Sequence, residues 1–234
     1  MGIGKEVGRR LGPQAHKLAP ELTTNFVHEA LARAISGTGP LPGAAKVADR
    51  RLAEADGDAG EAVKSLIEQH VRYAGAQGFA TNIGGLVTAA LTVPANIAGL
   101  ALIQCRMVAA IAHLRGYDLD DRRVRNAILA VILGEDDVQR LIKKRLIPAP
   151  PMAIATAPAY DPELDKLMAA EVTSELLTRV AGKRAATLVG RRIPVVGGMI
   201  GAGTDGYATW AIGRYADREL LPRTRRQPPQ DPTG

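Results

Sequence analysis

The stretch Tyr73–Cys105 reads YAGAQGFATNIGGLVTAALTVPANIAGLALIQC and contains no charged side chain. It is long enough to cross a bilayer core of about 30 Å. Its glycines, asparagines and threonines make it a poor transmembrane helix, and Pro94 lacks the backbone donor that a continuous helix would use there. We therefore expect two helices, 81–92 and 95–114. They would form a central apolar, glycine-rich hairpin that is either buried in the core or placed at a membrane interface.

The chain on both sides of this hairpin predicts further helices. Hydrophobic residues make up 46% of the sequence and aromatic ones only 3%, so the core must consist of Ala, Leu, Val and Ile, which favours closely packed helices. We predict an all-α fold, a multi-helix bundle of about seven or eight helices. Apolar residues recur at helical spacing in the ranges 21–35, 44–54, 58–74, 118–133, 138–146 and 162–181, and in a last helix that ends near residue 221.

Proline-rich segments divide the chain. The prolines between residues 148 and 158 predict a linker over 148–161, and the tail over 222–234 has three arginines and four prolines and is predicted to be disordered. The sequence thus consists of an N-terminal segment (1–19), a helical block (20–147), the linker, a C-terminal helical block of the same domain (162–221) and the tail.

Three glycine-containing motifs occur in a fixed order: GFATNIGG at 78–85, LRGYDLDD at 114–121, and IPVVGG at 193–198 followed by GAGTD at 201–205. Together they resemble the EcsC family over about residues 60–220. The resemblance implies a helical protein without an agreed catalytic role, so it supplies no catalytic residues. The sequence departs from the family pattern at 93–96, VPAN, where the resemblance leads us to expect an acidic residue beside the proline.

The run Gly201–Gly206 matches the dinucleotide-binding pattern G-x-G-x-x-G. Such a site also needs a following strand with an acidic residue about 20 positions on, and only one helix and the proline-rich tail remain. Pro194 also fits poorly in a central strand. We interpret the glycines at 197, 201 and 206 (Gly197, Gly201, Gly206) as positions of close helix packing.

No other pattern predicts catalysis. The four histidines have no zinc-ligand spacing, and neither a nucleophile elbow nor a P-loop is present. The acidic groups at 118–121 and 135–137 are interpreted as helix caps. We therefore predict a non-enzymatic protein with no catalytic residue, metal or cofactor. An enzyme that binds a phosphate-bearing ligand at the glycine-rich C-terminal segment is the less favoured alternative.

The net charge of +6 suits an anionic partner. The basic clusters lack the interleaved aromatic residues that favour nucleic acid, so we predict a membrane surface or a protein partner instead. One basic cluster adjoins an apolar helix start, as in segments that contact anionic lipid. Its predicted anionic-surface residues are Lys183, Arg184, Arg191 and Arg192, and its predicted apolar contacts are Ile193, Val195 and Val196.

The sequence also bears on the compartment. No secretory signal precedes the first helix, and the single cysteine, Cys105, lies in an apolar stretch and fits a reducing environment. We predict a cytoplasmic protein that associates with a membrane or binds a protein partner. The alternative is a soluble helical adaptor whose apolar hairpin lies wholly in the core.

Overall fold

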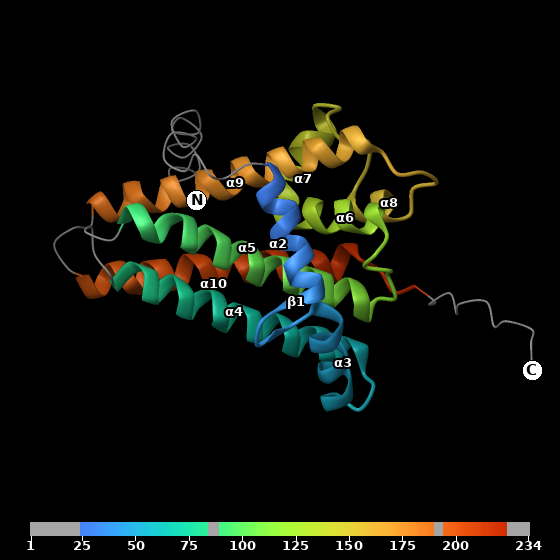
Figure 1. The fold of residues 1–234 in the computed structure, drawn as a ribbon, viewed down its shortest axis with the longest axis horizontal. Helices are drawn as coiled ribbons and strands as arrows, with labels where there is room; N and C mark the ends of the chain where they lie inside the picture. Colours follow the sequence, from blue (N-terminus) through green and yellow to red (C-terminus); the bar gives the residue numbers. More distant parts are fainter. Residues whose placement is uncertain (1–23, 84–88, 190–193, 224–234) are drawn as a thin grey trace, which may run out of the picture.

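The computed structural model describes residues 24–83, 89–189 and 194–223. In the helices next to the two internal gaps, over 79–83, 89–97, 179–189 and 194–202, it describes the backbone alone. These described parts of the chain form nine helices and one very short two-stranded sheet (Figure 1), which confirms the all-α prediction.

The helices differ widely in length, from five residues to 28. In chain order they are α2 (Thr24–Ser36), α3 (Ala44–Glu54), α4 (Ala59–Ile83), α5 (Ala89–Leu114), α6 (Arg122–Leu133), α7 (Glu135–Lys143), α8 (Pro151–Ala155), α9 (Pro162–Val189) and α10 (Pro194–Glu219). The strands β1 (Gly37–Thr38) and β2 (Leu41–Pro42) pair antiparallel between α2 and α3, with Gly37 opposite Pro42.

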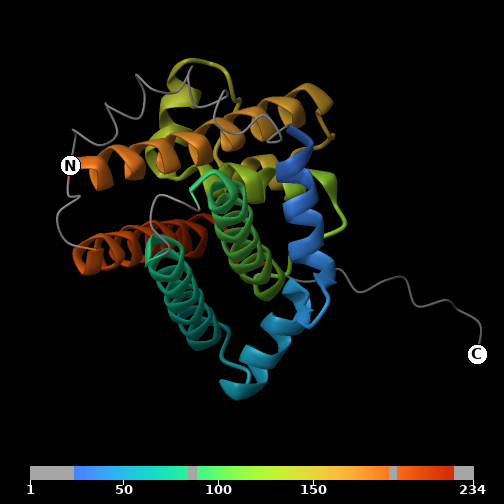
Figure 2. The same ribbon diagram turned by 60° about the vertical axis from the view of Figure 1, so that its left-hand side comes forward.

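Four long helices, α4, α5, α9 and α10, form the body of the bundle. Figure 1 shows that α4 and α9 end, and α5 and α10 begin, on the same side of the molecule. α4 and α10 pack against each other along their length, and α5 packs against both (Figure 2). α6, α7 and α8 lie around the opposite end of the long helices, and α2 crosses α5 and α9.

The centre of the core is helix α5. Every residue from Gln104 to Ala112 is buried, as is every residue from Asn126 to Leu133 of α6. A helix that is apolar on all sides must be covered on all sides. α5 meets this requirement by packing against α2, α3, α4, α6, α9 and α10.

The prediction that Pro94 ends a helix is wrong. α5 begins at Ala89 and continues through Pro94 to Leu114. Pro94 is the sixth residue of α5, and the first four backbone N–H groups of a helix have no acceptor within it. Because proline has no backbone N–H, Pro94 removes only one backbone hydrogen bond, directly after the first turn of α5. α4 ends at Ile83 and α5 begins at Ala89, and Gly84 and Gly85 between them lie outside the described residues, so the glycine-rich turn of the hairpin stays a prediction.

Two further boundaries differ from expectation. α9 continues through Gly182 to Val189, because an interior glycine costs a helix only about 1 kcal/mol relative to alanine and does not by itself end it. Part of the segment predicted as a linker forms α8, whose Pro151, Ile154 and Ala155 are buried and which packs against α6. The prolines there start a short helix, since proline fits its first turn.

Candidate functional site

The predicted contact residues come from two helix ends on the same side of the bundle. Lys183 and Arg184 lie in the last two turns of α9, and Val195 and Val196 lie in the first turn of α10. Gly197 and Gly201 follow in α10. Their backbone is described and their side chains are not, while Arg191, Arg192 and Ile193 lie outside the described residues.

Acidic residues are missing from the sequence of this part of the bundle. The segments 73–105 and 176–204 contain five basic residues and no acidic one, whereas the rest of the chain contains 25 basic and 24 acidic residues. We call these two segments the acid-free half and the remainder the ion-paired half. α4 and α9 end, and α5 and α10 begin, on the same side of the molecule, so the described parts of both segments extend to that side. The two segments together carry five of the six net positive charges of the chain.

No helix within the described ranges is both long and apolar enough to span a membrane.

In the ion-paired half, charged side chains hold the helices together. Arg115 at the end of α5 donates to Asp217 of α10 over 2.5 Å, and the two side chains are only 15% and 25% exposed. Arg218 of α10 pairs with Glu135 of α7. Each of these bonds joins segments that are far apart in the sequence, so it fixes the position of α10 against the body of the bundle.

The acidic groups that the sequence assigned to helix caps lie at helix starts. Asp121 is the N-cap of α6 and accepts a hydrogen bond of 2.8 Å from the backbone N–H of Arg123. Its side-chain hydrogen bond with Arg123 lowers its pKa. Asp118, expected to be the cap, instead accepts from the N–H of Asp120 in the preceding turn. Among the residues that the structure describes, no three His, Cys, Asp or Glu side chains gather into a group able to hold a metal ion.

A buried histidine lies at the border between the two halves. His70 of α4 has no exposed surface, and its Nδ1 lies 2.8 Å from the carbonyl oxygen of Leu66. A carbonyl only accepts, so Nδ1 carries the proton, and the buried Nε2 has no hydrogen-bond partner among the residues that the structure describes. Burial lowers the pKa of His70 to about 4, the hydrogen bond to Leu66 opposes this, and the nearby charge of Arg106 adds to it. The imidazole is therefore neutral at pH 7.

The charged neighbour of His70 is equally unusual. Arg106 of α5 is the first charged residue after the uncharged stretch, yet it is only 7% exposed. Its buried Nε has no hydrogen-bond partner within the described part of the chain, and its guanidinium lies 5.9 Å from the ring centroid of Tyr73. Burial lowers its pKa. Sequence reasoning missed this residue, although a single charged residue within an otherwise apolar stretch is a recognisable signal.

The same helix carries the single cysteine. Cys105 is 1% exposed, and burial raises the pKa of its thiol to about 12. A thiol in this state is not a nucleophile, so Cys105 serves as a core residue.

The comparison with protein families fits this helical architecture. The model of the EcsC protein family matches residues 6–224, nearly the whole chain and more than the 60–220 range that the motifs covered. The chain belongs to the EcsC protein family. No curated protein and no solved structure matches it.

Helix α10 of this EcsC protein presents two aromatic side chains to the outside. Tyr207 is 54% exposed and Trp210 is 47% exposed, and their rings lie 5.8 Å apart at an angle of 30°. The opposite face of α10 is buried, through Asp205, Thr209 and Ile212. Thr209 accepts a hydrogen bond of 3.2 Å from the buried Gln104 of α5. Sequence reasoning missed the exposed pair, because which face of α10 is covered depends on the packing of α4 and α5.

The glycines of α10 differ in how closely α4 approaches them. Gly206 is buried, but a Cβ added there would lie 3.7 Å from Val71, an ordinary contact, so its role in close packing stays a prediction. A Cβ at Gly213 would lie 2.9 Å from Cγ1 of Ile67 and 3.2 Å from the sulfur of Met107. Among the glycines of α10 whose surroundings are described, Gly213 is therefore the one where α4 and α5 leave no room for a side chain. The sequence did not single it out.

Proposed function

We propose that this EcsC protein is a membrane-peripheral protein that attaches reversibly to anionic lipid through its acid-free half. The observation that carries the proposal is the charge distribution. Five basic residues and no acidic one occupy two segments that the fold brings to one side of the bundle, while the remainder is almost balanced. A surface of this kind attracts an anionic bilayer and has no acidic residue of its own sequence to oppose the attraction.

Attachment needs both attraction and apolar contact. A basic residue near an anionic membrane contributes about 1 kcal/mol, and this contribution weakens as salt increases. An apolar side chain such as Ile193, Val195 or Val196 adds about 1.5 to 3 kcal/mol if it is fully buried in lipid. The four basic residues at 183, 184, 191 and 192 alone would give weak, salt-sensitive binding, and the adjoining apolar residues make it stable.

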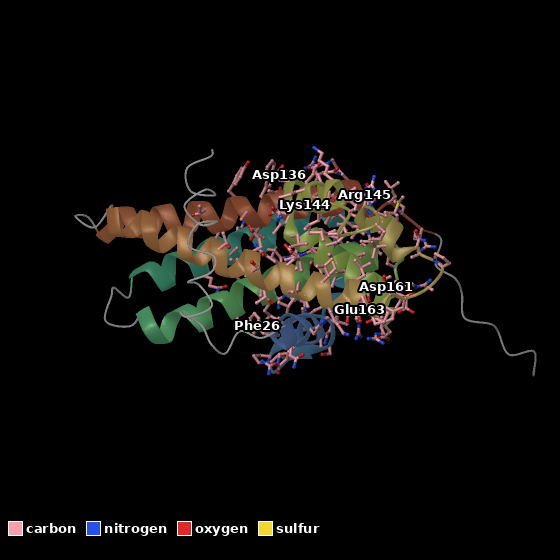
Figure 3. The ribbon with its side chains drawn as sticks, turned by 90° about the horizontal axis from the view of Figure 1, so that it is seen from above. Phe26, Asp136, Lys144, Arg145, Asp161 and Glu163 are labelled. Carbon is pink, nitrogen blue, oxygen red and sulfur yellow. The ribbon has the colours of Figure 1, made fainter. Side chains whose placement is uncertain are left out.

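Liposome flotation tests the proposal with a charge-matched control. One variant changes Lys183, Arg184, Arg191 and Arg192 to Gln. The control changes four exposed basic residues of the ion-paired half to Gln, namely Lys143, Lys144, Arg145 and Lys166. Figure 3 labels Lys144 and Arg145 of this set, which lie away from the free ends of α4 and α5. Both variants lose the same net charge, so they differ only in where the charge is lost.

We expect the wild type to float with phosphatidylserine-containing vesicles at low salt and less at moderate salt, and not with neutral vesicles. The variant of the acid-free half should lose most of this binding, and the control should keep it. Equal loss in both variants would mean that net charge alone is responsible. A wild type that never floats would contradict the proposal.

The soluble adaptor is the alternative function, and one observation favours it. The side chains of the uncharged stretch are described over 73–78 and 98–105, and the C-terminal part, from Leu100 to Cys105, is mostly buried in the bundle. In this alternative the whole stretch is core, and one helical face binds another protein. A wild type that stays in the soluble fraction under every lipid and salt condition would favour the adaptor.

A further inference from the structure

The exposed aromatic pair on α10 is unusual because this chain contains few aromatic residues. The protein has one tryptophan, five tyrosines and two phenylalanines, and it exposes its only tryptophan beside a half-exposed tyrosine. Tyr207 and Trp210 do not belong to the buried face of α10, which contacts α4 and α5 through other residues. Tyrosine and tryptophan combine an apolar ring with a polar atom, and for that reason they concentrate where one side is apolar and the other wet.

The charges around the pair indicate which partner it meets. Arg214 follows Trp210 by one turn and is 45% exposed. The acidic residues of this part of α10 are withdrawn from the surface: Asp205 is 2% exposed, and Asp217 is 25% exposed and bound to Arg115 and Arg214. From Gly203 to Arg214 the outward face of α10 thus presents the aromatic pair and one arginine, and the single acidic residue of this range, Asp205, is buried. This composition matches the headgroup region of an anionic bilayer, where aromatic and basic side chains anchor proteins.

The face is also continuous with the acid-free half. α10 begins there at Pro194, and Tyr207 comes 13 residues later. At 1.5 Å per residue this places the aromatic pair roughly 20 Å along the helix axis. A bundle that touched the bilayer with its tip alone would leave Trp210 in water. A bundle that lies with α10 along the surface brings the basic residues near its start and the aromatic pair to the lipid together, as interfacial helices do.

We infer that Tyr207 and Trp210 insert into the headgroup region of an anionic bilayer, so that α10 lies in the plane of the membrane. The inference rests on the proposed function and adds the orientation of the bound protein and two anchoring residues. Trp210 is the only tryptophan, so the intrinsic tryptophan fluorescence of the full chain reports on this site alone.

The first measurement is emission on addition of phosphatidylcholine vesicles with and without phosphatidylserine. With the anionic vesicles, the emission of Trp210 should shift to shorter wavelength, and lipids brominated near the top of the acyl chain should quench it. Flotation of the wild type with unchanged and unquenched emission would overturn the inference and leave the proposed function intact. A wild type that does not float would overturn both.

The second measurement is affinity, with a control matched for exposure. Replacing Tyr207 and Trp210 by Ser should weaken vesicle binding about tenfold. Replacing Leu146 and Leu221 by Ser, which are 47% and 51% exposed and lie in the ion-paired half, should leave it unchanged. Circular dichroism should show native helix content and melting for both variants, because each removes partly exposed side chains. Equal affinities for the two variants would contradict the anchoring role of the aromatic pair.

Discussion

The two halves of this EcsC protein use basic residues in different ways. In the ion-paired half, arginines bind acidic residues of other helices, as Arg115 does with Asp217 and Arg218 does with Glu135. In the acid-free half, neither segment contains an acidic residue. Charge in the first half therefore stabilises the arrangement of helices, whereas we propose that charge in the second half binds an external anion. The proposed function thus falls on the half whose two segments contain no acidic residue to pair with their cations.

Helix α5 connects the two halves, and the border between them has its own chemistry. Arg106 is the first charged residue of α5, and it is buried beside His70 and Tyr73. Among the described residues no carboxylate forms an ion pair with this buried cation, so a second positive charge nearby is costly. The neutral state of His70 follows from this arrangement and from its burial.

The largest expected effect is a loss of stability at acid pH caused by His70. Its pKa is about 4 in the fold against an ordinary value of 6.5. Between these values the unfolded chain binds a proton that the folded chain does not, so stability present above pH 6.5 falls as the pH decreases toward 4. The full difference corresponds to about 3 kcal/mol. Urea unfolding of the wild type and of His70→Leu at several pH values measures it.

In this experiment the wild type should lose stability more steeply than His70→Leu between pH 6.5 and 4. His28→Gln, which removes a partly exposed histidine, is the control and should keep the wild-type slope. The groups that face His70 are Arg106 of α5, Arg51 of α3 and Tyr73 of its own helix. Identical slopes for the wild type and His70→Leu would show that burial does not keep His70 unprotonated in the folded protein.

The second effect compares two glycines along α10. Gly213→Leu should destabilise the protein by about 1 to 3 kcal/mol, because a Cβ there already lies 2.9 Å from Ile67 and leaves no room for a longer side chain. Gly206→Ala meets only an ordinary contact of 3.7 Å with Val71, so the better helix propensity of alanine should stabilise the protein by up to about 1 kcal/mol. Urea unfolding followed by circular dichroism gives both values. Similar effects at the two positions would contradict the difference in packing.

Local signals in the sequence were sufficient for the fold class and several helix starts. The predicted helical range 162–181 begins at the residue where α9 begins, and Asp161 before it is a local start signal: its carboxylate accepts from the N–H of Glu163 over 2.9 Å. These signals act within one turn of helix, so no tertiary information is needed. The effect of Pro94 could not be predicted in the same way, since it depends on how far upstream the helix begins.

The candidate site was only partly accessible from the sequence. The basic cluster at 183–192 was visible, but the acid-free half was not, because it consists of two segments that only the fold brings together. The outward direction of Trp210 and the burial of Arg106 likewise depend on which neighbouring helices cover α10 and α5. The spacing of apolar residues in the sequence locates the apolar face of a helix, but it does not show which other helix covers that face.

The third effect tests the ion-paired half. Arg115→Met should destabilise the protein by about 1 to 2 kcal/mol, because Asp217 is then left largely covered with only Arg214 at 3.6 Å. This value lies between the cost of breaking an exposed pair and that of breaking a fully buried one. Lys166→Met, which removes an exposed pair with Glu163, is the control and should leave stability nearly unchanged. Equal values would mean that partial burial does not strengthen the pair between α5 and α10.

The smallest expected effect decides whether the comparison between the halves holds. The double substitution Lys183→Gln and Arg184→Gln should change the free energy of unfolding by less than about 0.5 kcal/mol, since neither acid-free segment offers these residues a carboxylate and surface charge contributes little to stability. The same substitution should weaken vesicle binding, because two basic residues near an anionic surface contribute about 1 kcal/mol each. Thermal unfolding and flotation of one preparation measure both quantities. A loss of stability comparable to that of Arg115→Met would show that these cations hold the fold together as those of the ion-paired half do. Weaker binding would then follow from unfolding. In that case the basic residues of the two halves would not differ in their roles.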